Sequence, residues 1–154
     1  MSEYEDVAPK FREAMINKAK VEIPFWKLLG MEVADIKKGQ ARIRIPYAPN
    51  LTNANGVVHG GVIFSAADAA VGTALVGMVD RHELITTIEM KINYLKPVDG
   101  CDIFAEAHII HKGTQTAIAE VEVRDTNGNL VAKALATYAI IKKSATDDKL
   151  PLGE

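Results

Sequence analysis

The apolar positions at the start of the chain recur at helical spacing. Over residues 7–22 they fall on one face, and charged residues fill most other positions, which predicts an amphipathic helix. That face carries Phe11, Met15, Ile16 and Ala19. Because proline disfavours helical backbone in the residue before it, Pro24 is expected to end this helix. The apolar residues 25–29 are then expected to form a turn that leads to Gly30.

Later segments alternate between apolar and polar residues, as strands do when one face is buried. Over residues 41–47, for example, apolar residues alternate with Arg42 and Arg44. The strands predicted in this way cover residues 31–36, 41–47, 84–98, 101–112, 114–126 and 130–142. Glycine-bearing turns separate them at 37–39, 99–100, 112–113 and 127–128. The last four strands exceed the usual length of about five or six residues, as a sheet that curls around a long helix requires.

Between the two groups of strands lies a polar loop, residues 53–61, followed by about five turns of apolar helix, residues 62–79. That helix is apolar nearly all round, so it is expected to be buried. Asp68 is its only charged residue, and a lone buried carboxylate is costly unless it is hydrogen-bonded or has a chemical role. The segment is long enough to be tested as a membrane span, but a charge near its middle favours a buried helix of a soluble protein.

The order of these elements predicts an α+β domain. We expect a curved antiparallel sheet with the apolar helix packed against its concave face. The chain would then divide into an N-terminal helix and lead-in at 1–24, the main domain at 25–142 and a loose C-terminal tail at 143–154. Since exposed strand edges need covering or pairing, a homo-oligomer is expected.

Composition narrows the class of protein and its surroundings. The chain has 154 residues, 48% of them hydrophobic and 25% charged, which suits one soluble domain with its own core. A net charge of −2 argues against nucleic-acid binding. The single cysteine, Cys101, rules out an internal disulfide and fits a reducing cytoplasm. The acidic, polar N-terminus is not typical of a secretory signal, so a cytoplasmic protein is expected.

The junction between the loop and the apolar helix carries His59, Gly60 and Gly61. The first turn of a helix leaves backbone N–H groups unpaired and carries a partial positive charge. Glycine there lets a ligand carbonyl approach closely, because no side chain stands in the way. A backbone N–H aimed at a carbonyl oxygen forms an oxyanion hole, which can lower a reaction barrier by about 3 kcal/mol.

Asp68 follows Gly61 by seven residues, which places it ~10 Å further along the helix axis. This gap is too large for one helix to present both the oxyanion donor and the carboxylate to the same carbonyl. If both take part, two chains share each site, with Gly60 of one subunit facing Asp68 of the partner subunit. The spacing therefore predicts an obligate dimer with its sites in the interface.

Two stretches carry a resemblance to a known family. They are Asn53-x-x-Gly56-x-x-His59-Gly60-Gly61-x6-Asp68 and residues 86–97, which end in Asn93-Tyr94-Leu95-Lys96-Pro97. Both are similar to segments of the hotdog-fold acyl-CoA thioesterases, in particular the PaaI-like (phenylacetic acid degradation thioesterase) family. The resemblance covers residues 25–142, and the predicted order of elements agrees with a hotdog fold.

The resemblance implies roles for several of these residues. The Gly60 N–H would donate to the thioester carbonyl, and Asp68 of the partner subunit would act as nucleophile or general base. Thr87, or Thr86 beside it, would hold the attacking water or the carboxylate. The residues implied at the thioester end of the site are Asn53 and His59. The substrate-binding candidates are Gly61, Leu51, Val57, Phe64 and Tyr94.

Each catalytic candidate also has a purely structural interpretation. Asp68 can bridge groups within the core, because structural networks also bury carboxylates. His59 can stabilise the loop through a hydrogen bond to the backbone. Asn53 and Asn55 are common turn residues, and Thr87 is a common strand residue.

The family implies an acyl-CoA thioesterase that releases a free carboxylic acid and CoA. CoA is then part of the substrate, so no cofactor is expected, and the spacing of the other histidines, His82, His108 and His111, does not suggest a metal site. The family also implies a dimer with shared sites, arranged as a dimer of dimers. The lysines that could meet the phosphates of CoA are Lys91, Lys96, Lys112 and Lys133, without preference among them.

Two other functions remain open. A non-catalytic acyl-CoA sensor would leave Asp68 without a role, and residues 1–30 are too short and too weakly basic for a DNA-binding module. A hotdog hydratase or dehydratase would carry Pro-Gly after its catalytic histidine, whereas Gly60 follows His59 here. The acyl group cannot be read from residue types, since hydrophobic pockets separate chain lengths by only about 1–3 kcal/mol per group.

Overall fold

The computed structural model describes residues 4–144, and the side chains of all of these except 19–21. The elements are α1 (Pro9–Val21), α2 (Pro24–Leu29), β1 (Glu32–Lys37), β2 (Gln40–Ile45), a short 3-10 helix η1 (Pro49–Leu51), α3 (Gly60–Val76), β3 (Glu83–Tyr94), β4 (Ile103–Lys112), β5 (Thr116–Asp125) and β6 (Leu130–Lys142). The predicted tail lies almost wholly outside the described residues, as does the side chain of Ala19.

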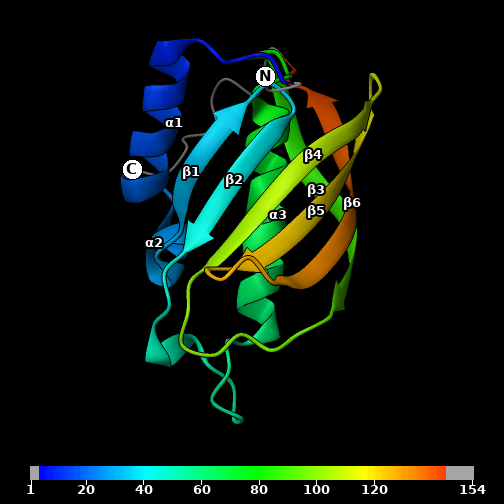
Figure 1. Cartoon of the computed structure of the whole chain (residues 1–154). Coiled ribbons are helices and arrows are strands. Elements are labelled where there is room, and N and C mark those ends of the chain that lie inside the picture. Colours follow the sequence, from blue (N-terminus) through cyan, green and yellow to red (C-terminus); the bar gives the residue numbers. More distant parts are fainter. Residues whose placement is uncertain (1–3, 145–154) are drawn as a thin grey trace.

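The strands form a single antiparallel sheet in the order β1-β2-β4-β5-β6-β3. The sheet curves around α3, which lies against its concave face, while α1 lies beside β1 (Figure 1). The predicted α+β architecture, a curved antiparallel sheet around one long helix, is therefore confirmed.

Three details of the sequence-based prediction are wrong. Residues 25–29 belong to the short helix α2 rather than a turn, because Pro24 stands in its first turn, where a missing N–H costs nothing. The strand predicted at 84–98 ends at Tyr94. Its neighbour is β6 rather than β4, so residues 99–100 lie in a long connection and not in a hairpin turn.

Alanines form much of the contact between α3 and the sheet. Those at most 2% exposed are Ala66, Ala67, Ala70 and Ala74 in α3, and Ala41, Ala105, Ala107, Ala117, Ala119, Ala132 and Ala136 in the strands. Small side chains let the helix lie close to the sheet, at the density of protein interiors. The helix is buried, as its composition predicts. Within residues 4–144, no helix has the length and apolarity needed to cross a membrane.

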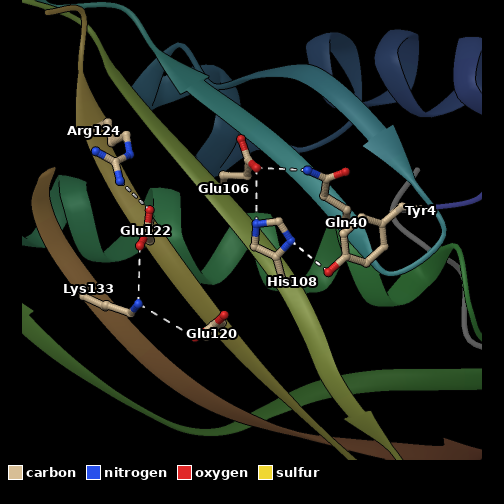
Figure 2. Close-up of polar contacts among 8 residues, drawn as sticks. All are labelled: Tyr4, Gln40, Glu106, His108, Glu120, Glu122, Arg124 and Lys133. Atoms are coloured by element: carbon tan, nitrogen blue, oxygen red, sulfur yellow. Dashed lines mark hydrogen bonds and ion pairs between the residues drawn. The ribbon is translucent and has the colours of Figure 1, made fainter. Parts of the chain in front are cut away.

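The opposite, convex face of the sheet carries a network of polar contacts (Figure 2). The network drawn there comprises Tyr4, Gln40, Glu106, His108, Glu120, Glu122, Arg124 and Lys133. Lys133 Nζ lies 3.3 Å from a carboxylate oxygen of Glu122 and 3.9 Å from one of Glu120. Because two carboxylates already face this ammonium group, Lys133 is a weaker candidate than an unpaired lysine for contact with the phosphates of CoA.

Asp102 fixes the exit from β2, from which the chain runs toward the polar loop. Its Oδ2 accepts hydrogen bonds from Arg44 at 3.0 and 2.7 Å, and its Oδ1 accepts the backbone N–H of Tyr47 at 2.8 Å. The Tyr47 N–H and, next, the Arg44 guanidinium lower the pKa of Asp102 below its usual value. The contact therefore ties the end of β2 to the start of β4.

Replacing Asp102 by asparagine is expected to destabilise the protein in a pH-dependent way. Because its folded-state pKa is lowered, Asp102 stabilises the fold above its unfolded-state pKa of about 3.9, and this contribution disappears as the pH falls through the folded-state value. At pH 7 the free energy of unfolding should fall by about 1–2 kcal/mol. Urea unfolding of both proteins at neutral and acidic pH tests this, and a difference independent of pH would contradict it.

Candidate active site

The polar loop ahead of α3 closes on itself through Asn53. The Asn53 N–H donates to the Val57 carbonyl at 2.8 Å, and the Asn53 carbonyl accepts the Gly56 N–H at 2.9 Å. Its side-chain Oδ1 accepts the Asn55 N–H at 2.9 Å. Gly56 has a φ of 78°, a left-handed conformation that favours glycine. The turn role considered for Asn53 is thus present in the structure.

His59 is the N-cap of α3. Its backbone N–H donates to the Leu51 carbonyl at 2.8 Å, which anchors the loop. Its Nδ1 accepts the Gly61 N–H at 2.9 Å. Since Nδ1 is the acceptor, the proton of the neutral imidazole lies on Nε2. The structural role considered for His59, a hydrogen bond to the backbone, is therefore observed, and Gly61 is its partner.

One backbone donor of the first turn of α3 is left over. The N–H groups of the three residues after Gly60 all donate to His59, whereas the Gly60 N–H has no acceptor within the described residues. The Tyr94 hydroxyl donates to the Gly60 carbonyl at 2.8 Å. The peptide between Gly60 and Gly61 is therefore held at its oxygen by Tyr94 and at its nitrogen by His59. This leaves a single free N–H at the positive end of a long helix.

A pocket of about 310 Å³ opens beside this N–H. Its lining residues are Asn53, Val58, Gly60, Ile63, Tyr94, Leu95, Lys96, Pro97 and Val98. Most of them are apolar, and of the four candidate lysines only Lys96 is among them. A Cβ on Gly60 would lie 3.2 Å from the Tyr94 ring, so a larger residue there would crowd the pocket.

Four predicted substrate-binding residues do not line this pocket. Gly61 is exposed in the first turn of α3. Leu51 is buried in the core, Val57 is half-buried in the loop and Phe64 is half-buried on α3. Their contact with substrate stays a prediction. Sequence reasoning also missed several residues that do line the pocket, among them Ile63 and Val98, because their part in it depends on how the chain folds back.

Asp68 lies about two turns along α3 from Gly60. Its Oδ1 accepts hydrogen bonds from the hydroxyls of Thr87, at 2.8 Å, and Tyr138, at 2.6 Å. Thr86 points to the other face of β3, because side chains alternate along a strand. Of the two threonines left open by the sequence, Thr87 is therefore the one that contacts Asp68.

Tyr138 is a residue that sequence reasoning missed. It is 4% exposed and lies directly opposite Thr87 in the pairing of β3 with β6. Burial, and next its hydrogen bond to Asp68, raise the pKa of Tyr138, so its hydroxyl keeps its proton at neutral pH. A signal was present in the sequence, since a lone tyrosine among inward-facing alanines of one strand needs a partner for its hydroxyl.

The structure brings these residues together in two groups. Asn53, Gly60 and Tyr94 meet at the pocket, and Asp68 meets Thr87 beside β3. The two groups lie ~12 Å apart along the axis of α3. Within one chain, the Gly60 N–H and the Asp68 carboxylate are therefore too far apart to act on one carbonyl.

The edge of the sheet nearest Asp68 is open. Within the described chain, β3 pairs only with β6 and leaves its other edge unpaired. Leu84 and Ile88 on this strand are 45% and 56% exposed. An unpaired strand with exposed apolar side chains is a natural place for another chain to add.

Histidines and the cysteine make ordinary contacts. His82 accepts a hydrogen bond from Arg81, His108 lies 3.2 Å from Glu106, and Cys101 donates to a backbone carbonyl. Among residues 4–144, no three or more His, Cys, Asp or Glu side chains gather in a way that could hold a metal ion.

Fold, site and sequence together define the class of protein. Residues 55–132 match the thioesterase superfamily. The chain belongs to this superfamily and is a thioester hydrolase with a hotdog fold, which confirms the resemblance seen in its motifs.

Individual relatives support this assignment. A protein of Saccharolobus solfataricus is 30% identical over 142 residues, which cover 92% of this chain and 94% of its own. The medium/long-chain acyl-CoA thioesterase YigI of Escherichia coli is 32% identical over 133 residues, covering 77% of this chain and 86% of YigI. The structure of the E. coli PaaI protein, from the phenylacetic acid degradation operon, superposes with a TM-score of 0.73. At 23% identity, covering 84% of this chain and 97% of PaaI, it shows the shared fold.

Proposed function

We propose that this protein hydrolyses acyl-CoA thioesters to a free carboxylic acid and CoA. The observation that carries the proposal is the free Gly60 N–H, which lies at the positive end of α3 and beside a mainly apolar pocket. The similarity to YigI, which is named for medium- and long-chain acyl-CoA, supports acyl-CoA as the substrate class.

Gly60 supplies the electrostatic part of the mechanism. As a nucleophile adds to the thioester carbonyl, negative charge builds on the carbonyl oxygen, and the Gly60 N–H donates to it. Because the neighbouring peptide is held by Tyr94 and His59, this donor needs no rearrangement during the reaction. Lys96 lines the same pocket, which favours it among the four candidate lysines for contact with a phosphate of CoA.

Asp68 of the partner subunit supplies the chemical step, by one of two routes. As general base it takes a proton from water, and the hydroxide adds to the carbonyl carbon. As nucleophile it bonds to that carbon and forms a mixed anhydride, which water then hydrolyses. In both routes the carbon–sulfur bond breaks, CoA leaves as a thiolate and takes up a proton, and the acyl group ends as a carboxylic acid.

The shared site is part of the proposal. Within one chain, Gly60 and Asp68 lie too far apart to act on the same carbonyl. The unpaired edge of β3 lies next to Asp68 and Thr87. Pairing of two chains along β3 would let each pocket receive Asp68 of the partner subunit. The arrangement as a dimer of dimers and the cytoplasmic location stay predictions.

Release of free thiol from a panel of acyl-CoAs tests the proposal. The panel comprises phenylacetyl-CoA, hydroxybenzoyl-CoA and straight-chain esters from butyryl to dodecanoyl, and thiol is read with a disulfide reagent. We expect turnover of at least some members, because a mainly apolar pocket suits aliphatic or aryl chains. Tight binding of acyl-CoA by calorimetry without turnover of any ester would overturn hydrolysis and favour a sensor.

A further inference from the structure

Tyr138 and Thr87 converge on one oxygen atom. They face each other across β3 and β6, and both hydroxyls lie within hydrogen-bonding distance of Oδ1 of Asp68. Hydrogen bonds to a charged acceptor are shorter and about twice as strong as those between neutral groups. Two donors from adjacent strands therefore fix one oxygen of a carboxylate that belongs to a helix.

The second oxygen of the same carboxylate is left over. Among residues 4–144, no group donates a hydrogen bond to Oδ2 of Asp68, and the side chain is only half-buried. A carboxylate whose Oδ1 is held from two sides cannot rotate freely, so Oδ2 keeps one direction. Placement at this level matters, because a displacement of about 1 Å in a reacting group can cost 10²-fold in rate.

The Tyr138 hydroxyl donates its one proton toward Asp68. Tyr138 is 4% exposed, and the two acceptors within reach of this proton both belong to Asp68, namely Oδ1 at 2.6 Å and the backbone oxygen at 2.8 Å. By contacting both the side chain and the backbone of one residue, Tyr138 fixes the carboxylate relative to the helix that carries it.

We propose that Tyr138 is a positioning residue for Asp68. Together with Thr87, Tyr138 holds Oδ1 of Asp68 so that Oδ2 of the same carboxylate faces the thioester. The inference rests on the proposed function and deepens it. Tyr138 touches no substrate in this arrangement. Oδ2 either takes the proton of water or bonds to the acyl carbon, and in both cases Oδ1 remains an acceptor, so neither hydroxyl loses its partner.

Kinetics of Tyr138→Phe test the proposal, since phenylalanine keeps the buried ring and removes only the hydroxyl. We expect kcat to fall about 10- to 100-fold, the effect of losing one hydrogen bond to a charged group, while KM changes less than about twofold.

Two further variants complete the design. Tyr47→Phe is the matched control, because the Tyr47 hydroxyl has no hydrogen bond within the described part of the chain, and its kcat should equal that of the wild type. In an Asp68→Asn background, Tyr138→Phe should cause no additional loss of turnover, since a residue that acts only through Asp68 has nothing left to position.

The possible results distinguish a failure of the role inferred for Tyr138 from a failure of the proposed thioesterase mechanism. A lower melting temperature with unchanged kcat would show that Tyr138 is merely structural and overturn the inference. If Tyr138→Phe fails to fold, Thr87→Val removes the other donor to the same oxygen, and an unchanged kcat there would likewise overturn it. Full turnover by Asp68→Asn alone would instead overturn the proposed mechanism itself.

Discussion

Replacing Asp68 by asparagine is expected to reduce kcat for thioester hydrolysis by about 10³-fold, within the range usual for loss of a general base or nucleophile. An amide neither takes a proton from water nor forms an anhydride. Its oxygen can still accept the hydrogen bonds of Thr87 and Tyr138, so the fold should remain intact. Thiol release on the best ester of the panel measures the loss, and circular dichroism checks the fold.

Glu89 provides a matched control for this substitution. The Thr137 hydroxyl donates to a Glu89 carboxylate oxygen at 2.6 Å. Glu89 therefore resembles Asp68 in having a carboxylate that accepts a hydrogen bond from a threonine. Thr137 alternates with the inward-facing Tyr138, which places this pair on the other face of the sheet. Glu89→Gln should therefore retain wild-type turnover. Turnover of Asp68→Asn within a few-fold of the wild type would disprove the role assigned to Asp68.

Subunits that are inactive separately are expected to regain activity when they are paired. The first variant is Asp68→Asn, and the second is Gly60→Pro, which removes the backbone donor and should lower kcat by about 10²- to 10³-fold. Proline is tolerated at the first position of a helix, and His59 before it already has extended backbone, with φ −63° and ψ 136°. Gly60→Ala is the control, because it adds a Cβ beside Tyr94 but keeps the N–H.

A mixed dimer of the two variants contains one intact site and one doubly altered site. The intact site combines Gly60 from the Asp68→Asn chain with Asp68 from the Gly60→Pro chain. Random pairing of equal amounts should restore about a quarter of wild-type sites, which exceeds either variant alone by roughly 100-fold. Co-expression with two different tags isolates the mixed dimer for the assay. If the purified mixed dimer is as inactive as its parents, the sites are not shared between chains.

The sequence was informative where a signal is local. The all-round apolar character of α3 and the alternation along β2 indicate their burial directly, and the glycines after His59 mark the free end of the helix. The pairing of β3 with β6 is not local, since it depends on a connection that crosses the sheet. The sequence of residues 99–100 is typical of a hairpin turn, so it wrongly suggested that the strands on either side of it are neighbours in the sheet.

The same distinction between local and long-range signals holds for the residues of the candidate site. Gly60 was identified because the loop and the helix start adjoin in the chain, and Asn53 because it belongs to the motif that resembles the thioesterase family. Tyr138 was not, because 70 residues separate it from Asp68 and only the folded sheet brings them together. The choice between Thr86 and Thr87 likewise needed the true register of β3, which decides which of the two faces the helix.

The alanine contact between α3 and the sheet bears on how such an enzyme can diverge. Its side chains are already so small that trimming them frees little space, and enlarging them would strain the contact between helix and sheet. An acyl chain must then be accommodated at the ends and edges of α3, outside this alanine layer, as in the pocket beside Gly60. We expect the acyl preference of descendants to drift through substitutions there, while the inner layer stays nearly constant.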